Sequence, residues 1–428
     1  MARLTGPRRD SATAARSRVD PTERVLPSEA LSPEAVPPEA MPTVGKGGGR
    51  TSRFFGFVGH LRTFESLRDR DFRWFYLAML GQMAAMNMQL LVRGALTYHL
   101  TGSYAALGLV GLANALPMLF LSPFGGVMAD RLPKRTVLIL GQASSLVIAV
   151  AVAALLFADL LIFEYLVLSA VVQGVVMALM MPSRQAMIPD LVGRAMMMNA
   201  ISLNMAGMNT MRLFAPAIGG FIIAWWNFEL AYVAMAGLYV VAIVGMLQVT
   251  WSAAVTKTAQ GTTARQVVGM ALVDIKEGAV YIARTPLMRT ILSVTVLSSM
   301  FGMPYLFLLP GYVADIFAGD GADLGLLISS SAVGSLVGAL VLASLPNKHR
   351  GRVLLIGMAI MGAALIVFPL TTNFFVAIGI ILFLGLGSAL RQALSQGLLL
   401  AYVDEAYRGR VMAVFLMQFS IMQLGVFL

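Results

Sequence analysis

One short charged stretch organises the sequence: Gly126-Val127-Met128-Ala129-Asp130-Arg131-Leu132-Pro133-Lys134-Arg135. An apolar stretch of about 20 residues lies on each side of it, which is the length that a helix needs to cross a bilayer. Charged residues and a proline are disfavoured in the hydrocarbon region, so they mark a turn at the membrane surface. The sequence therefore predicts two membrane-spanning helices joined by this turn.

The composition of the whole chain gives the same picture. Of its 428 residues, 58% are hydrophobic and only 12% are charged, and the mean hydropathy is +0.80. Since a soluble globular chain is about a quarter charged, most of this chain must be shielded from water by something other than a soluble fold. We predict an all-α polytopic membrane protein.

The same composition argues against several other kinds of protein. The chain has no Cys and only three His, at positions 60, 99 and 349, so we expect no disulfide, no metal site and no cofactor. It has no P-loop motif for ATP and no carboxylate pair inside an apolar stretch, which argues against a membrane-embedded enzyme. The net charge of +10 comes from basic residues that separate apolar stretches, so we expect no nucleic-acid binding.

Eleven apolar stretches from Trp74 onward are long enough to span a membrane. We predict spans at residues 74–98, 105–129, 136–157, 162–186, 197–223, 228–250, 287–314, 323–345, 353–371, 374–401 and 410–428. An odd number of spans would put the two chain ends on opposite sides, and the last span runs to Leu428 without a polar flank. We therefore expect that truncation has removed a twelfth helix from the sequence.

The charges between the spans indicate how the chain is oriented. All Lys and Arg of these loops fall on one side: Arg131, Lys134, Arg135, Arg194, Lys257, Arg265, Lys276, Arg284, Arg289, Lys348, Arg350, Arg352, Arg408 and Arg410. The other side has acidic residues only: Asp159, Glu164, Glu229, Asp315, Asp320 and Asp323. Because cytoplasmic loops are enriched in Lys and Arg, we predict a multi-pass protein of the plasma or inner membrane with a cytoplasmic amino terminus.

The chain divides into four predicted parts. Residues 1–60 have too few large apolar side chains to form a core and should be a disordered cytoplasmic extension. Residues 61–250 should form an amino-terminal bundle of six helices, led by an interfacial helix at 61–73, although these leading residues fit an ordinary basic flank equally well. Residues 251–285 should be a cytoplasmic linker, and residues 286–428 an incomplete carboxyl-terminal bundle.

The two bundles carry a weak internal repeat. Leu107-Gly108-Leu109 corresponds to Leu324-Gly325-Leu326, and Val137-Leu138-Ile139-Leu140-Gly141 corresponds to Val353-Leu354-Leu355-Ile356-Gly357. Arg184-Gln185-Ala186 at the end of the fourth span recurs as Arg391-Gln392-Ala393 in the tenth. Matches at equivalent helices, in the same order, indicate a fold duplicated about an axis normal to the membrane.

The charged turn also resembles a family signature. In the major facilitator superfamily, helices two and three are joined by Gly, three residues, Asp-Arg, a turn and two basic residues, which correspond here to Gly126, Asp130, Arg131, Lys134 and Arg135. The resemblance implies the major facilitator fold of two six-helix bundles, in which this cluster is a cytoplasmic latch that stabilises the outward-open state. The alternative is a loop that serves only to fix topology. The equivalent residues 347–352 keep the cations and lack the acid.

Other motifs resemble the exporter branch of that superfamily, which includes enterobactin-type siderophore exporters and macrolide or multidrug efflux permeases. They are Tyr98-His99-Leu100-Thr101-Gly102-Ser103, Pro182-Ser183-Arg184-Gln185-Ala186, Pro189-Asp190-Leu191-Val192 and Arg408-Gly409-Arg410-Val411-Met412. The fifth span resembles the antiporter motif at Pro216, Gly219 and Gly220. Met211 and Ala215 stand where that motif has glycine, which weakens the inference of antiport.

Three predicted spans carry polar stripes, which we interpret as walls of one water-filled substrate cavity. The candidates are Gln82, Gln89 and Arg93 of the first span, Asn204, Asn209 and Arg212 of the fifth, and Arg391, Gln392 and Gln396 of the tenth. The alternative for each arginine is that it binds helix carbonyls or reaches the membrane surface. No Asp or Glu lies inside a span, so the cavity should favour neutral or anionic amphipathic substrates.

Sequence and resemblance together predict a secondary active transporter rather than an enzyme. It should export small amphipathic molecules, such as drugs or siderophores, by rocker-switch alternating access coupled to an ion or proton gradient. The alternatives on the same fold are a lipid or lysophospholipid flippase and a solute uptake permease. We expect the chain to act as a monomer whose partners are its small-molecule substrate and the lipid bilayer.

Overall fold

The computed structural model describes residues 66–250, 276–345, 349–404, 407–416 and 418. The predicted extension at 1–60 and most of the predicted linker at 251–285 lie outside these residues. The described residues form helices joined by short turns, and none of them is in a strand. The prediction of an all-α membrane protein is confirmed.

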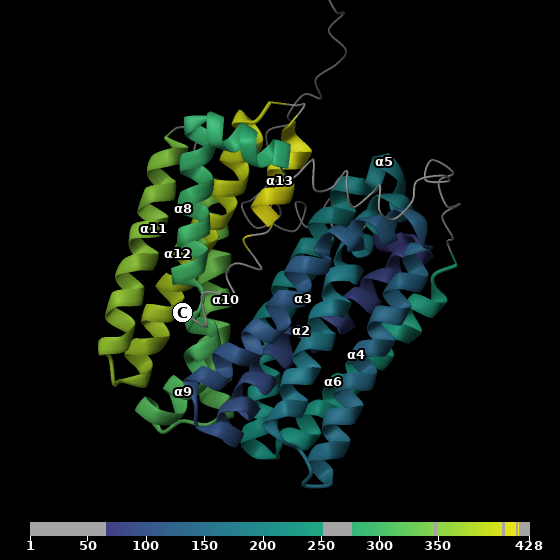
Figure 1. Ribbon diagram of the computed structural model, residues 1–428, viewed down its shortest axis with the longest axis vertical. Helices are drawn as coiled ribbons and strands as arrows, with labels where there is room; N and C mark the ends of the chain where they lie inside the picture. The colour runs from purple at the N-terminus through teal and green to yellow at the C-terminus, as the bar shows by residue number, and fades with distance from the viewer. Residues whose placement is uncertain (1–65, 251–275, 346–348, 405–406, 417, 419–428) are drawn as a thin grey trace, which may run out of the picture. The chain divides into compact units, whose positions relative to one another are not determined.

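Five helices make up the amino-terminal half (Figure 1): α2 (Arg70–Thr101), α3 (Tyr104–Arg131), α4 (Lys134–Phe157), α5 (Phe163–Trp225) and α6 (Phe228–Gln248). Local sequence sets their ends. Asp69 caps α2 by accepting a hydrogen bond of 2.8 Å from the Phe72 N–H, and Gly102 ends it in the left-handed conformation, at φ 58°. Asn227 caps α6 in the same way as Asp69 caps α2.

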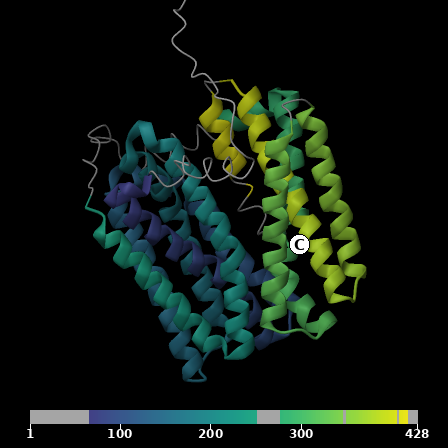
Figure 2. The same ribbon diagram turned by 180° about the vertical axis from the view of Figure 1, so that it is seen from behind.

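The carboxyl-terminal half contains α8 (Pro286–Gly302), α9 (Tyr305–Phe317), α10 (Gly321–Ser344), α11 (Arg350–Val367), the 3₁₀ turn η3 (Phe368–Leu370), α12 (Phe374–Tyr402) and α13 (Arg408–Leu416). Asp320 and Asp323 form a capping box that begins α10, since each side chain accepts a hydrogen bond from the other's backbone N–H. α12 packs between α10 and α11, and Figure 2 shows the three helices side by side from behind.

The predicted fourth and fifth spans form one continuous run of helical residues, α5. The chain still reverses direction within it. Gln173 and Met180 pair in antiparallel order with Ser145 and Gly141 of α4. Gly207 lies against Tyr76 of α2 and Gly219 lies against Met88, so this part of α5 runs parallel to α2. Because two tight turns make α2 and α4 run the same way, the two parts of α5 run in opposite directions. The two spans are thus present, but the predicted loop between them, residues 187–196, is helical.

The structure adds detail at two other predicted segments. The span at 287–314 consists of α8 and α9, which are separated at Met303 and Pro304, because proline has no N–H with which to continue the first helix. The expected interfacial helix at 61–73 is described only from residue 66. There it is a 3₁₀ turn at 66–68 followed by the first turn of α2, so residues 66–73 hold no separate α-helix.

Within the described residues, nine helical stretches are long and apolar enough to cross a membrane. The two other predicted spans are the second part of α5 and the span at 410–428. The second part of α5 belongs to the same long helix as a stretch already counted. The last span is described only as far as Leu416, together with Gln418.

The packing of the helices supports the internal repeat. A methyl group on Gly174 of α5 would clash with the carbonyl oxygen of Asn114 in α3, and one on Gly385 of α12 would clash with that of Ser331 in α10. Asn114 and Ser331 are 217 residues apart, which equals the spacing between Leu107 and Leu324. The two halves therefore bring their second and fourth helices together in the same way, through a glycine that allows close approach.

Candidate functional site

The two ends of the helices differ in charge. The acidic end is the end at Thr101, Tyr104, Trp225, Phe317 and Gly321, where the connecting turns contain no Lys or Arg. The basic end is the opposite one, where Lys134 and Arg135 begin α4. From the loop charges we expect the acidic end to lie outside the cell.

The polar stripe of α2 is buried inside the amino-terminal half. Gln82 and Gln89 are 1% and 3% exposed, because α5 and α6 pack against this face of α2. The side-chain Oε1 of Gln82 accepts a hydrogen bond of 3.3 Å from the Gln142 amide of α4, and Oε1 of Gln89 accepts one of 3.4 Å from the hydroxyl of Tyr239 in α6. The narrow spacing predicted for this stripe thus corresponds to one buried, hydrogen-bonded face.

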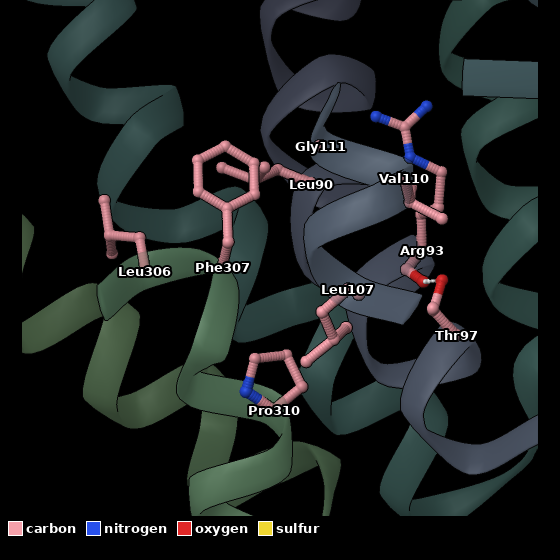
Figure 3. Close-up of a pocket in the computed structure, with 10 residues that line it drawn as sticks. Leu90, Arg93, Thr97, Leu107, Val110, Gly111, Leu306, Phe307 and Pro310 are labelled. Carbon is pink, nitrogen blue, oxygen red and sulfur yellow. Dashed lines mark hydrogen bonds between the residues drawn. The ribbon is translucent and has the colours of Figure 1, made fainter. Parts of the chain in front are cut away.

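Arg93 continues the same stripe toward the acidic end. Its side chain is 8% exposed, and its Nη1 is buried without a hydrogen-bond partner among the described residues. It lines a pocket between α2, α3 and α9, which Figure 3 shows with the apolar side chains of Leu107, Phe307 and Pro310 around it. Arg93 therefore lies where the two halves meet.

The candidates of α5 are less enclosed. Asn204 is half-buried, and its amide group contacts the sulfur of Met208, one turn further along the helix. Asn209 and Arg212 are exposed. Arg212 interacts electrostatically with Tyr305 of the carboxyl-terminal half, so its charge faces the other half of the protein.

The candidates of α12 belong to the carboxyl-terminal half. Arg391 is 2% exposed, and its Nη1 donates a hydrogen bond of 3.1 Å to the hydroxyl of Ser299 in α8. Gln392 is half-buried and Gln396 is exposed. α12 packs on α10 and α11, whereas α2 packs on α5 and α6, so the stripes of α2 and α12 lie in different bundles.

The buried arginines Arg184 and Arg391 occupy equivalent places in the two halves. Arg184 of α5 lies 3.2 Å from the sulfur of Met83 in α2, as Arg391 of α12 lies 3.1 Å from Ser299 in α8. Met83 and Ser299 are 216 residues apart, which is the spacing between Gly141 and Gly357. Each arginine thus links the fourth helix of its half to the first.

The predicted latch is described only in part. The side chains of Gly126, Asp130 and Arg131 lie outside the described residues, although their backbone belongs to α3. Lys134 forms an ion pair of 2.5 Å with Asp190 of α5. The Arg135 guanidinium donates hydrogen bonds to the carbonyls of Met246 and Leu247, which ends α6. Both cations therefore bind within the amino-terminal half in this structure.

The helix-five motif lies at the contact between the halves. Pro216 and Gly220 face α10: a methyl group on Gly220 would clash with the carbonyl oxygen of Gly321, and Gly325 approaches the Pro216 carbonyl. Gly219 faces Met88 of α2 instead. Further along the crossing, the Ser329 hydroxyl donates a hydrogen bond of 2.7 Å to the Leu213 carbonyl. The motif allows α5 and α10 to approach each other at backbone distance.

A hydrogen-bonded cluster that the sequence did not reveal joins the halves at the acidic end. The Asp315 carboxylate of α9 accepts hydrogen bonds of 2.6 and 2.9 Å from the hydroxyls of Tyr98 in α2 and Tyr104 in α3. Asp315 was predicted to lie in a loop, one residue beyond the span at 287–314, but α9 continues to Phe317. The tyrosines are more than 200 residues away in sequence, so no local pattern links them to Asp315.

Comparison with known proteins gives a family match and two informative relatives. Residues 75–424 match the profile of the Major Facilitator Superfamily. The staphyloferrin A transporter of Staphylococcus aureus (strain NCTC 8325 / PS 47) is 26% identical over 337 residues, which cover 77% of this chain and 80% of that protein. The quinolone resistance protein NorA of Staphylococcus aureus is 33% identical over 123 residues, or 29% of this chain and 30% of that protein.

Solved structures show the same fold at low sequence identity. The nucleoside transporter NupG superposes with a TM-score of 0.63 at 14% identity, covering 83% of this chain and 89% of that one. A bacterial homologue of the human lysosomal transporter Spinster, in an inward-facing and unoccupied conformation, superposes with a TM-score of 0.62 at 16% identity, covering 83% and 80%.

Proposed function

Because the chain belongs to the Major Facilitator Superfamily, we propose that this multi-pass membrane transporter exports small amphipathic molecules by rocker-switch alternating access. An ion or proton gradient drives the export. One chain forms the whole transport path, with residues 61–250 and 286–428 as the two moving halves and residues 251–285 as the linker between them.

The observation that carries this proposal is the closure at the acidic end. Tyr98 and Tyr104 of one half share the Asp315 carboxylate of the other, and the crossing of Gly220 with Gly321 lies near the same end. With that end outside the cell, these contacts close the transport path to the outside, as in the inward-facing and occluded states of an alternating-access cycle. Opening of this end would then release the substrate to the outside.

Two features support export rather than uptake. The exporter-like motifs extend over most of the chain, and the two relatives above are a siderophore transporter and a drug resistance protein by name. Nucleoside uptake is not favoured by the likeness to NupG, because at 14% identity that likeness concerns the fold alone.

The candidate residues take three roles in the proposal. Arg93 and Arg212 lie at the interface of the halves and contribute positive charge to the substrate path, together with the amides Asn204 and Asn209. Gln82 and Gln89, which are buried against α4 and α6, support the face of α2 that carries Arg93. Arg391, Gln392 and Gln396 line the path from the other half. Asp130 and Arg131, with Lys134 and Arg135, form the latch of the outward-open state, for which Lys134 and Arg135 leave their present partners.

The test is export from cells that express the full chain in an efflux-deficient bacterial host. The probes are matched anionic, neutral and cationic amphiphiles, and the readout is resistance together with the rate at which preloaded cells lose each probe. We expect wild-type cells to export anionic or neutral probes, and Asp130→Asn and Arg212→Ala to reduce export at least several-fold.

Matched variants distinguish a specific loss from a general one. Asp159→Asn and Arg289→Ala change an exposed acid and an exposed arginine outside the proposed path and should export like the wild type. Probe accumulation above that of control cells would contradict export in favour of uptake. Movement of a fluorescent lysophospholipid in vesicles, without export of any soluble probe, would contradict it in favour of a flippase.

A further inference from the structure

The pocket at Arg93 has apolar walls that come from both halves (Figure 3). Leu107 and Val110 of α3 lie on one side, and Phe307 and Pro310 of α9 lie on the other. Arg93 supplies the charge in this lining. The cavity between these walls has a volume of about 20 Å³, so in this closed state it holds only a small group such as a carboxylate. When the halves separate, the apolar walls on either side of the cation suit a ligand that has an apolar body and a single negative group.

The Arg93 guanidinium is buried without a counter-ion. Its Nη1 has no partner in the described part of the chain, and the groups that face it from α6 are the hydroxyls of Tyr232 and Tyr239 rather than carboxylates. The Tyr232 hydroxyl is itself buried and without a hydrogen-bond partner among the described residues. An unpaired buried charge is strongly unfavourable, so this arrangement is explained best by an anionic ligand that completes it.

The other arginines inside the spans lack the combination found at Arg93. Arg184 lies 3.2 and 3.1 Å from the sulfurs of Met83 and Met181. Arg391 donates from Nη1 to the Ser299 hydroxyl, and its Nε is buried without a partner among the described residues, but it does not line this pocket. Arg212 is exposed. Arg93 thus combines burial, an unpartnered donor and a position in a pocket.

We propose, resting on the transport function above, that Arg93 binds the carboxylate of the exported substrate. A guanidinium offers two parallel N–H donors that match a carboxylate, and a single arginine balances a single negative charge. The apolar part of the substrate lies against Phe307 and Pro310. The amino-terminal half therefore recognises the charge and the carboxyl-terminal half recognises the apolar body, so a bound substrate bridges the two halves.

The test uses the full chain in lipid nanodiscs and two probes that share one ring system. The probes are 1-naphthylacetate and its neutral amide, 1-naphthylacetamide, and their dissociation constants are measured by calorimetry. We expect the wild type to bind the acid roughly ten- to a hundred-fold more tightly than the amide, since a hydrogen bond to a charged group contributes about 1.5–3 kcal/mol. Arg93→Met should bind both probes equally, and Arg93→Lys should keep a reduced preference for the acid.

Two controls separate binding from a structural role. Arg289→Met removes an exposed arginine at the basic end and should leave the preference for the acid unchanged. Without any probe, Arg93→Met should melt at the wild-type temperature or above it, because it removes an unpaired buried charge. The proposal would be overturned if Arg93→Lys and Arg93→Met both melted at a lower temperature than the wild type and both kept the wild-type preference for the acid.

A third probe, acetate, distinguishes a substrate carboxylate from a small free anion. If acetate binds at Arg93 as tightly as 1-naphthylacetate, the site takes a free anion and the proposal is wrong. Export is measured separately in proteoliposomes with the same probes. Charge-selective binding that depends on Arg93, without transport of either probe in any direction, would count against the proposed transport of such substrates but leave the Arg93 site intact.

Discussion

Asp315 is the residue on which closure of the acidic end depends most directly. Its carboxylate accepts hydrogen bonds from two tyrosines that belong to the opposite half. Asp315 and Tyr104 are exposed and Tyr98 is half-buried, so water competes for these bonds and their contribution is modest, on the order of 1 kcal/mol together. A contribution of this size still changes the ratio of open to closed molecules about five-fold.

We predict that Asp315→Asn shifts the protein toward states that are open at the acidic end. The amide loses the charge that strengthens both hydrogen bonds, and Tyr98→Phe should have a smaller effect because it removes one bond. The sequence has no Cys, so in a variant with Leu160→Cys and Thr372→Cys the spin labels attach only at these two positions. Pulsed electron resonance should show a larger population of long distances between the labels in Asp315→Asn.

Tyr165→Phe is the matched control for this prediction. Tyr165 is a tyrosine of α5 at the acidic end, 43% exposed, and its hydroxyl makes no hydrogen bond to the described residues. Its loss should leave the distance distribution unchanged. The same distribution in wild type, Asp315→Asn and Tyr98→Phe would show that other contacts hold this end closed.

Glycines control how closely the helices pack. In α12, a side chain on Gly385 would meet the backbone of Ser331 in α10, whereas one on Gly379 would meet nothing within 4 Å. In α5, a side chain on Gly220 would meet the backbone of Gly321, which belongs to the other half of the protein. The first contact lies within one bundle and the second between the two bundles, so substitutions at these sites should have different consequences.

Gly385→Ala should destabilise the protein. The added methyl group meets a carbonyl oxygen that cannot move without its helix, and overpacking of this kind costs about 1–3 kcal/mol. Gly379→Ala in the same helix should be neutral or slightly stabilising, because alanine favours a helix by about 1 kcal/mol over glycine. Thermal unfolding in nanodiscs compares the two, and equal melting temperatures would rule out tight packing at Gly385.

Gly220→Ala should leave each bundle intact and change the relation between them. The methyl group forces α5 away from Gly321, so we expect less of the state that is closed at the acidic end. The spin-label pair at 160 and 372 measures the shift, with Gly237→Ala of α6, where a methyl group meets nothing within 4 Å, as the control. No shift in Gly220→Ala would mean that the crossing does not restrict opening.

At the scale of the whole molecule, the difference between acidic and basic ends implies a topology. Thr372 lies in the turn after η3 at the acidic end, and Ser344 ends α10 at the basic end. Both are exposed. A membrane-impermeant maleimide should therefore label Thr372→Cys in intact cells and Ser344→Cys only after permeabilisation. Labelling in the reverse order would invert the topology and make the closed end cytoplasmic.

The features that the sequence predicted are those set by local composition. The bounds of α3, α4 and α6 lie within two residues of the predicted spans, because tight turns with charged or small residues separate them. The polar stripe of α2 proved to be one buried face, because helical periodicity alone places Gln82, Gln89 and Arg93 on one side. Periodicity could not show that the stripes of α2 and α12 lie in different bundles.

The features that the sequence did not predict depend on distant partners or on single backbone groups. Asp315 meets Tyr98 only after α9 has folded against α2, and no spacing along the chain encodes this contact. Pro304 divides one apolar stretch into α8 and α9 without any change in hydropathy. In α5, the residues between two spans remain helical, so a loop predicted from polarity alone was wrong.

The buried stripe of α2 also bears on how the protein is made. Among the candidate spans, α2 has the lowest mean hydropathy, 1.3, and the largest share of buried residues, 67%. Arg93 lies about two turns before the end of α2 at Thr101, and an arginine inside an inserting helix costs at most about 2.5–3.5 kcal/mol at the translocon, the value for the helix centre. α2 is thus poorly suited to rest alone in lipid, although it leaves the ribosome before the other described spans. We expect it to stay beside the insertion machinery until α5 and α6 have been synthesised and can cover its polar face.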